Sequence, residues 1–203
     1  MSIKIPPPPK ESMQVLISGL QKLPPAAVGG AAPMTLEDAR SPESNISFPH
    51  KVYNLGLRDI VFGKAIDAAQ LVSWRYLINE GTRGTAAAEV NYDEKKQSNQ
   101  FAQLNYGAFA SATLEEINKV VDNRQFQKGS YELRVLRVPA LYVTALWLKD
   151  LQNNQDIVIP IPPTNTCLKP SEEYTPSKFI QLLHQPAQQK LRFDSSPHVE
   201  QTR

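Results

Sequence analysis

The run RVLRVPALYVTALWL, residues 134–148, is the most hydrophobic stretch of the chain, and it contains Pro139. Read as one strand, residues 131–148 would be about three times the usual length of five or six residues. Because proline cannot donate a hydrogen bond to a strand ladder, it belongs at an edge, a bulge or the first position of a strand. The sequence therefore predicts two strands, 131–138 and 140–148, or one sharply bent strand, with Pro139 at the corner.

Both faces of the second of these strands are apolar. The pleat separates two sets of side chains: Leu141, Val143, Ala145 and Trp147 on one face, and Tyr142, Thr144, Leu146 and Leu148 on the other. The following strand, DIVIPIP at 156–162, repeats the pattern. Since helices on one side of a sheet cover only one face, we expect the second face to meet the proline-rich arm, a ligand or a second copy of the chain.

Two of the predicted helices rest on apolar spacing. Residues 57–79 carry apolar side chains along a wide stripe, and Gly81 is well placed to end a helix there. Residues 13–23 have the spacing of a short amphipathic helix within a proline-rich leader. We therefore expect one long, largely buried helix and one short helix near the N-terminus.

Two further helices are predicted from their end signals. Thr113 and Glu116 have the spacing of a capping box, and a helix starting there would stop at Lys128 and Gly129. Thr175 is the expected cap of the last helix, with Pro176 in its first turn and Pro186 at its end.

The strands 85–92 and 101–109 alternate in polarity and are expected to form a hairpin around a polar loop. The predicted order is then helix, two strands, helix, three strands, helix. Strands joined by short polar loops pair antiparallel. We therefore predict an α+β fold with an antiparallel sheet of about five strands and helices mainly on one face.

Three zones divide the chain. Residues 1–48 form a proline-rich arm, 49–184 the α+β domain, and 185–203 a polar tail. The leader 1–10 holds little apolar material, so we expect it to be dispensable for folding. The N-terminus lacks the apolar core of a secretory signal, and no run approaches the roughly 20 apolar residues needed to cross a bilayer. With one cysteine as well, we expect a cytoplasmic protein with no membrane partner.

Sequence motifs that mark catalytic or metal sites are missing. The chain has no phosphate-binding GxxxxGK, no GxGxxG, no HExxH and no GxSxG, so we expect no cofactor and no catalytic residue of those types. One cysteine and three histidines cannot build the usual structural zinc site, so we expect no metal. Cys167 and His184 could pair as nucleophile and base, but the proline-flanked loop around Cys167 favours a packing role.

Aromatic and arginine residues are the best candidates for binding contacts, although the same residue types also fill cores. The candidates, with one aliphatic neighbour, are Trp74, Arg75, Tyr76, Arg134, Arg137, Tyr142, Leu146 and Trp147. The net charge of +2, with scattered basic residues, argues against a nucleic-acid partner.

Two functions remain open from the sequence. The first is a non-catalytic interaction or assembly protein that forms a homodimer or docks on another protein. The alternative is a small hydrolase or small-molecule-modifying enzyme whose site is assembled from scattered polar residues: Glu89, Arg134, Arg137, Tyr142, Thr144 and His184.

Overall fold

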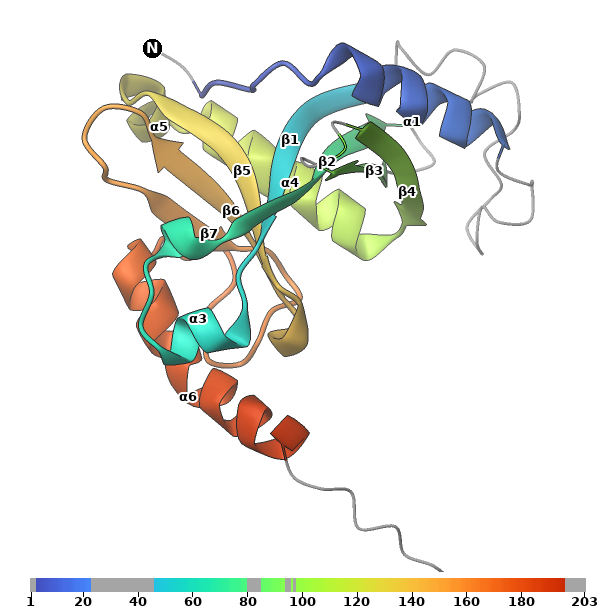
Figure 1. Cartoon of the computed structure of the whole chain (residues 1–203). Coiled ribbons are helices and arrows are strands. Elements are labelled where there is room, and N and C mark those ends of the chain that lie inside the picture. The colour runs from blue at the N-terminus through green and yellow to red at the C-terminus, as the bar shows by residue number, and fades with distance from the viewer. Residues whose placement is uncertain (1–2, 23–45, 80–84, 94–95, 97, 196–203) are drawn as a thin grey trace, which may run out of the picture.

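The computed structural model describes residues 3–22, 46–79, 85–93, 96 and 98–195 (Figure 1). The strands are β1 Ile46–Asn54, β2 Gln70–Asn79, β3 Thr85–Asp93, β4 Ser98–Tyr106, β5 Tyr131–Val138, β6 Val143–Asp150 and β7 Ile157–Pro160. The helices are α1 Lys10–Lys22, α3 Leu57–Val61, α4 Ala108–Asp122, α5 Arg124–Lys128 and α6 Pro176–Ser195, with short 3-10 turns η3 Ile66–Ala68 and η5 Pro139–Leu141.

The strands form a single seven-stranded sheet in the order β4-β3-β2-β1-β5-β6-β7. Strands β1 and β5, at the middle of this order, run parallel, and every other neighbouring pair runs antiparallel. The α+β class is confirmed, but the expected purely antiparallel sheet of about five strands is wrong in strand number and in direction.

The long helix predicted over 57–79 is not formed. The segment instead contains α3, η3 and the whole of β2. In β2, Trp74 and Tyr76 pack with the cluster on one face while Leu77 packs with the cluster on the other. A strand buried on both faces is apolar at nearly every position, so its pattern also satisfies a helical stripe.

Strand β1 was also not predicted from the sequence, because Pro49 lies inside it and argues against a strand. The pairing of β1 with β2 shifts register between Ser47 and His50, and Phe48 has a φ of 48°. Proline is tolerated inside a sheet at such a bulge, because the residue there need not donate a hydrogen bond to the neighbouring strand.

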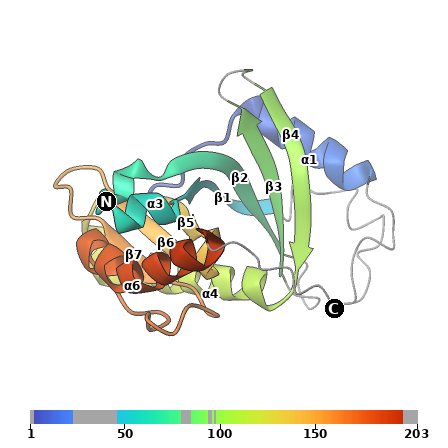
Figure 2. The same ribbon diagram turned by 60° about the horizontal axis from the view of Figure 1, so that its bottom comes forward.

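Helices cover both faces of the sheet, which corrects the expectation that they lie mainly on one. On one face, Ile117 and Val120 of α4 pack with Val135 and Leu146. On the other face, α6 packs over β5–β7 and α1 packs over β2–β4 (Figures 1 and 2). The pairings of Lys51 with Trp74 and Arg134, and of Arg134 with Trp147, place these last two helices on the same face.

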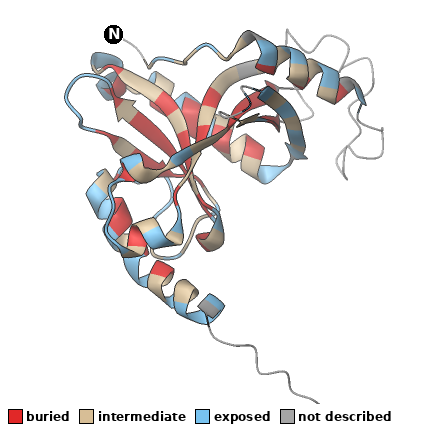
Figure 3. Cartoon of the chain, viewed as in Figure 1, coloured by how far each residue is buried: buried red, intermediate tan, exposed pale blue. Residues whose placement is uncertain are grey.

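The predicted division into two strands at Pro139 is confirmed, with η5 at the corner. The second strand begins at Val143 and not at Ala140, because Leu141 belongs to η5 and Tyr142 is left-handed. Buried residues concentrate in the strands (Figure 3). Leu146 and Leu148, on the second apolar face, are fully buried in the cluster that contains α4 residues. The chain therefore covers this face itself, and the reason for expecting a second copy on it is removed.

The N-terminal leader is part of the packed structure. The Lys4 amide donates to the Tyr131 carbonyl (2.6 Å), and the Leu133 amide donates to the Lys4 carbonyl (3.0 Å). Ile3 and Ile5 pack against the cluster beneath α4. The premise that this backbone is neither buried nor hydrogen-bonded, on which its expected dispensability depended, is wrong.

The two helices predicted from their end signals differ from that expectation at three ends. The helix expected to reach Lys128 ends at Asp122, and the separate helix α5 follows Asn123, whose side chain accepts from the Gln125 amide. Helix α4 starts at Ala108, after Gly107 with a φ of 108°, and the Thr113 hydroxyl donates to the Phe109 carbonyl (2.8 Å) inside the helix instead of capping it. Helix α6 is capped as predicted, because Thr175 Oγ1 accepts from the Lys178 amide (3.3 Å). It continues through Pro186 to Ser195.

Deletion of residues 1–5 is expected to lower the free energy of unfolding by about 2–3 kcal/mol, because two backbone hydrogen bonds and the packing of two isoleucines are lost. Urea unfolding of the parent and the truncated chain measures the difference. As a control, Phe62→Ser at a site 74% exposed should change stability by less than about 0.5 kcal/mol. A truncated chain as stable as the parent would show that the leader contributes nothing.

Candidate functional site

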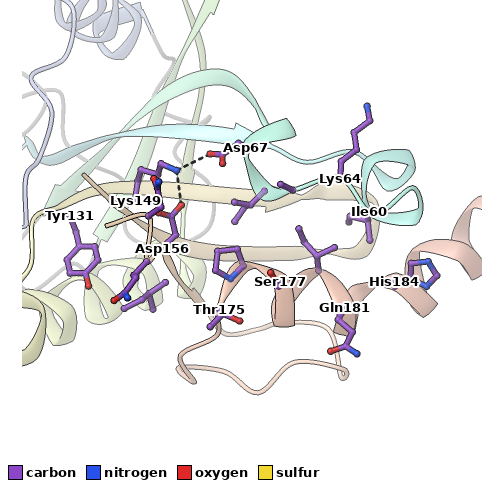
Figure 4. Close-up of a pocket in the computed structure, with 18 of the residues that line it drawn as sticks. Ile60, Lys64, Asp67, Tyr131, Lys149, Asp156, Thr175, Ser177, Gln181 and His184 are labelled. Atoms are coloured by element: carbon purple, nitrogen blue, oxygen red, sulfur yellow. Dashed lines mark hydrogen bonds and ion pairs between the residues drawn. The ribbon is translucent and has the colours of Figure 1, made fainter. Parts of the chain in front are cut away.

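A cavity of about 1130 Å³ lies between the loop after α3, the β6–β7 loop and the first turns of α6 (Figure 4). We call it the α6 cavity. Its lining combines ions, amides, hydroxyls and aliphatic side chains; the residues labelled in Figure 4 are Ile60, Lys64, Asp67, Tyr131, Lys149, Asp156, Thr175, Ser177, Gln181 and His184.

A network of ions closes one end of the α6 cavity. Lys149 Nζ lies 3.1 Å from Asp67 Oδ1 and 3.2 Å from Asp156 Oδ2. Trp147 Nε1 donates to Asp156 Oδ2 (2.8 Å), and the Asp150 amide donates to Asp156 Oδ1 (3.0 Å). Burial acts to lower the pKa of Lys149, but the two carboxylates outweigh it and raise the pKa, so this lysine stays charged. The network anchors the β6–β7 loop.

The expected packing role of Cys167 agrees with its surroundings. Cys167 is partly buried against the cluster that includes α6 residues. Burial raises the pKa of its thiol, which disfavours the reactive thiolate. His184 lines the α6 cavity, at the opposite end from Lys149 (Figure 4), and Cys167 is not among the residues that line this cavity.

A second polar site, the buried charge cluster, lies on the α4 face of the sheet. Arg137 binds the Glu89 carboxylate in a bidentate manner: Nη1 donates to Oε2 at 3.0 Å and Nη2 donates to Oε1. Ser73 Oγ also donates to Oε2 (3.3 Å), and Arg75 Nε lies 3.6 Å from Oε1. His50 completes the cluster; its Nδ1 lies 2.6 Å from the Phe48 carbonyl.

Strand register and sheet twist bring these residues together. Arg75 is paired with Glu89 on one side and with His50 on the other, so three neighbouring strands place them in one row. Arg137 comes from β5, and two strands, β1 and β2, lie between it and Glu89 on β3. The strong twist of the sheet (Figure 1) lets this one ion pair connect its two halves.

The members of the cluster differ in their charge states. Burial acts to raise the pKa of Glu89, but the hydrogen bonds and charge of Arg137, with help from Arg75 and Ser73, hold the pKa below its ordinary value. Burial, together with the nearby guanidinium of Arg75, lowers the pKa of His50 to about 3, so its imidazole is neutral. Burial lowers the pKa of Arg75 only to about 10, so its guanidinium remains charged. Arg75 and Arg137 thus face the Glu89 carboxylate together.

A smaller cavity of about 390 Å³, the β-face cavity, opens next to Arg137. Asn54, Arg137 and Thr144 stand side by side on β1, β5 and β6 along one row of the sheet and line it. The other lining residues are Phe109, Pro139, Tyr142, Val143 and Pro163. The cavity thus combines a polar floor with apolar walls.

The binding residues predicted from the sequence are mostly inside the molecule. Trp74 and Tyr76 are buried beneath α1, and Leu146 and Trp147 are buried on opposite faces of β6. The other four lie in three places: Arg134 over the rings of Tyr53 and Trp147, Arg75 and Arg137 in the charge cluster, and Tyr142 at the surface.

The polar residues considered for an enzyme lie in three separate places. Glu89, Arg137, Tyr142 and Thr144 gather at or beside the β-face cavity, whereas His184 lines the α6 cavity. Arg134 lies on the sheet face opposite the charge cluster. Sequence reasoning missed Asn54, His50 and Ser73 as site residues. A charged residue inside an apolar strand, as in SWRYLI and AAAEV, marks Arg75 and Glu89, and the three missed residues carry no such signal.

The stability of the protein is expected to fall as the pH decreases from 6.5 towards about 3, because the unfolded chain protonates His50 and the folded chain does not. This residue alone contributes a slope of up to about 1.4 kcal/mol per pH unit in that window. Urea unfolding at a series of pH values should show a shallower slope for His50→Gln. Ser73→Ala, which disturbs the same cluster without removing a titrating group, should keep the slope. An unchanged slope in His50→Gln would contradict the buried neutral imidazole.

The described residues contain no group of three or more His, Cys, Asp or Glu side chains placed to hold a metal ion. Within the same part of the chain, no helix is long and apolar enough to cross a membrane. No family model, no curated protein and no solved structure matches this chain. Its function must therefore be inferred from its own geometry.

Proposed function

We propose that the chain is a non-catalytic assembly protein that forms a homodimer through the free edge of β4. The observation that carries this proposal is an uncharged nine-residue edge strand, SNQFAQLNY, without proline. β4 is the first strand in the sheet order, and among the described residues no strand pairs with its outer edge. Natural sheets usually protect such an edge with lysine, proline or a covering segment.

The opposite edge of the sheet is closed, which makes the contrast informative. Val158 of β7 exchanges two backbone hydrogen bonds of 2.9 Å with Tyr174. The Ser171 amide donates to the carbonyl of Pro160 (2.9 Å). Because these contacts occupy the outer edge of β7, β4 is the edge on which a second chain can add a strand.

Helix α1 adds a complementary surface beside this edge. It lies so close to β4 that a Cβ on Gly19 would overlap the ring of Phe101. It carries Glu11 in its first turn and Lys22 in its last. A two-fold axis through paired β4 strands would run the two α1 helices antiparallel on one face, with Glu11 of one copy near Lys22 of the other. Two-fold symmetry is the commonest form of self-association.

The proposal keeps the protein partner expected from the sequence but moves the interface from a sheet face to a sheet edge. It also keeps the cytoplasmic location, which the single free cysteine supports. A second candidate, a small enzyme acting on a small molecule, is favoured by one observation: Arg137, Tyr142 and Thr144 surround one cavity beside Glu89.

Light scattering coupled to size-exclusion chromatography is expected to give twice the mass of a single chain for the parent protein. The double substitution Ala102→Lys and Asn105→Lys, at two exposed positions of β4, should weaken the dimer at least about tenfold, because like charges face each other across the two-fold axis.

The matched control is Gln152→Lys with Gln189→Lys, which adds the same charge at exposed positions far from β4 in the sequence. This control should remain dimeric. A monomeric parent, or a dimer that the β4 lysines leave intact, would refute self-association through this edge.

A further inference from the structure

Counted over the residues that the structure describes, the buried charge cluster has one more positive than negative charge. Two guanidinium groups, on Arg75 and Arg137, face the single Glu89 carboxylate, and the neighbouring His50 is neutral. An unbalanced charge taken out of water is costly unless a partner neutralises it. The α4 face of the sheet is therefore an environment that favours an anion.

Several polar atoms in and beside the cluster lack a hydrogen-bond partner. Within the described part of the chain they include Arg75 Nε and Nη1, His50 Nε2 and Asn54 Oδ1. Buried polar groups in native proteins nearly always have a hydrogen-bond partner. Several unpaired polar atoms in one place therefore point to a missing partner. Asn54 is the one of these residues that lines the β-face cavity, and its unpaired atom is an acceptor.

Arg137 connects the cluster to this cavity. Its guanidinium has five N–H groups, and the two contacts with Glu89 use one on each terminal nitrogen. Its side chain is 21% exposed and lines the cavity between Asn54 and Thr144. A carboxylate there could accept from Arg137 and from the Thr144 hydroxyl, while a hydroxyl group on the same molecule donates to Asn54 Oδ1.

The other residues that line the cavity are suited to the apolar part of a bound small molecule. Phe109 and Tyr142 stand at the cavity with two prolines, and Tyr142 is 89% exposed. The Phe109 ring lies 5.7 Å from the Arg75 guanidinium carbon, so the aromatic wall adjoins the excess positive charge. A cavity of about 390 Å³ falls in the lower part of the range for small-molecule sites.

We propose that the β-face cavity binds a small hydroxycarboxylate that carries an aromatic or aliphatic group. Arg137 and Thr144 donate hydrogen bonds to the carboxylate, and Asn54 accepts one from the hydroxyl. Phe109 and Tyr142 contact the aromatic or aliphatic group. The buried guanidinium of Arg75 supplies additional positive potential. This site is independent of the β4 edge, so binding does not require self-association.

Isothermal titration calorimetry with mandelate tests the proposal, because mandelate combines a carboxylate, a hydroxyl and a phenyl ring. Two matched probes separate the contributions: mandelamide lacks the charge, and phenylacetate lacks the hydroxyl. Mandelate is expected to bind saturably, with mandelamide at least about tenfold weaker and phenylacetate about fivefold weaker.

Variants then locate the site. Thr144→Val, which removes one donor at nearly constant volume, should weaken mandelate binding about tenfold, and Tyr142→Ala should weaken it severalfold. Tyr142 is exposed, so this variant is expected to fold even if changes nearer the cluster do not. Ser177→Ala, in the α6 cavity, is the control and should bind like the parent.

Three results would overturn the proposal. The first is the absence of saturable mandelate binding up to about 10 mM, a range that detects affinities weaker than most specific sites. The second is equal binding of mandelamide, which would exclude recognition of the charge. The third is a loss of binding in Ser177→Ala with none in Tyr142→Ala, which would place the molecule in the α6 cavity.

Discussion

The ion pair between Glu89 and Arg137 is the interaction on which the arrangement of the sheet most depends. It joins β3 to β5 across two intervening strands, so it can form only in a strongly twisted sheet. Glu89 is buried and Arg137 is 21% exposed, so water can replace only part of a lost contact. The pair also leaves Arg75 as the excess charge, and thereby gives the adjoining cavity its electrostatic character.

Packing on both sheet faces narrows the surfaces available for function. Helices α4 and α5 cover one face, and α1, α3 and α6 cover the other, so the most apolar hairpin of the chain, β5–β6, is internal. The surfaces that remain are of two kinds. One is the uncharged edge of β4, and the other is the two cavities, one beside α6 and one over β1, β5 and β6. An association surface and a small-molecule site can therefore coexist without sharing residues.

The sequence predicted the elements whose signals are local. Pro139 divided two strands correctly because a proline has few places in a sheet, and Thr175 capped α6 as expected. It failed where tertiary packing overrides a local rule. Segment 57–79 reads as a helix because burial on both faces hides the period of β2, and α6 passes Pro186 because Leu183 and Ala187 on either side are buried against the domain.

The candidate site was harder to predict than the fold, because its residues come from β1, β2, β3, β5 and β6 and meet only through register and twist. A double-mutant cycle on Glu89→Gln and Arg137→Gln, followed by urea unfolding, tests the central interaction most directly. Each single substitution should cost about 3–5 kcal/mol, and the double should cost about 2 kcal/mol less than the sum. Costs that add within about 0.5 kcal/mol would show that the pair does not connect the two halves of the sheet.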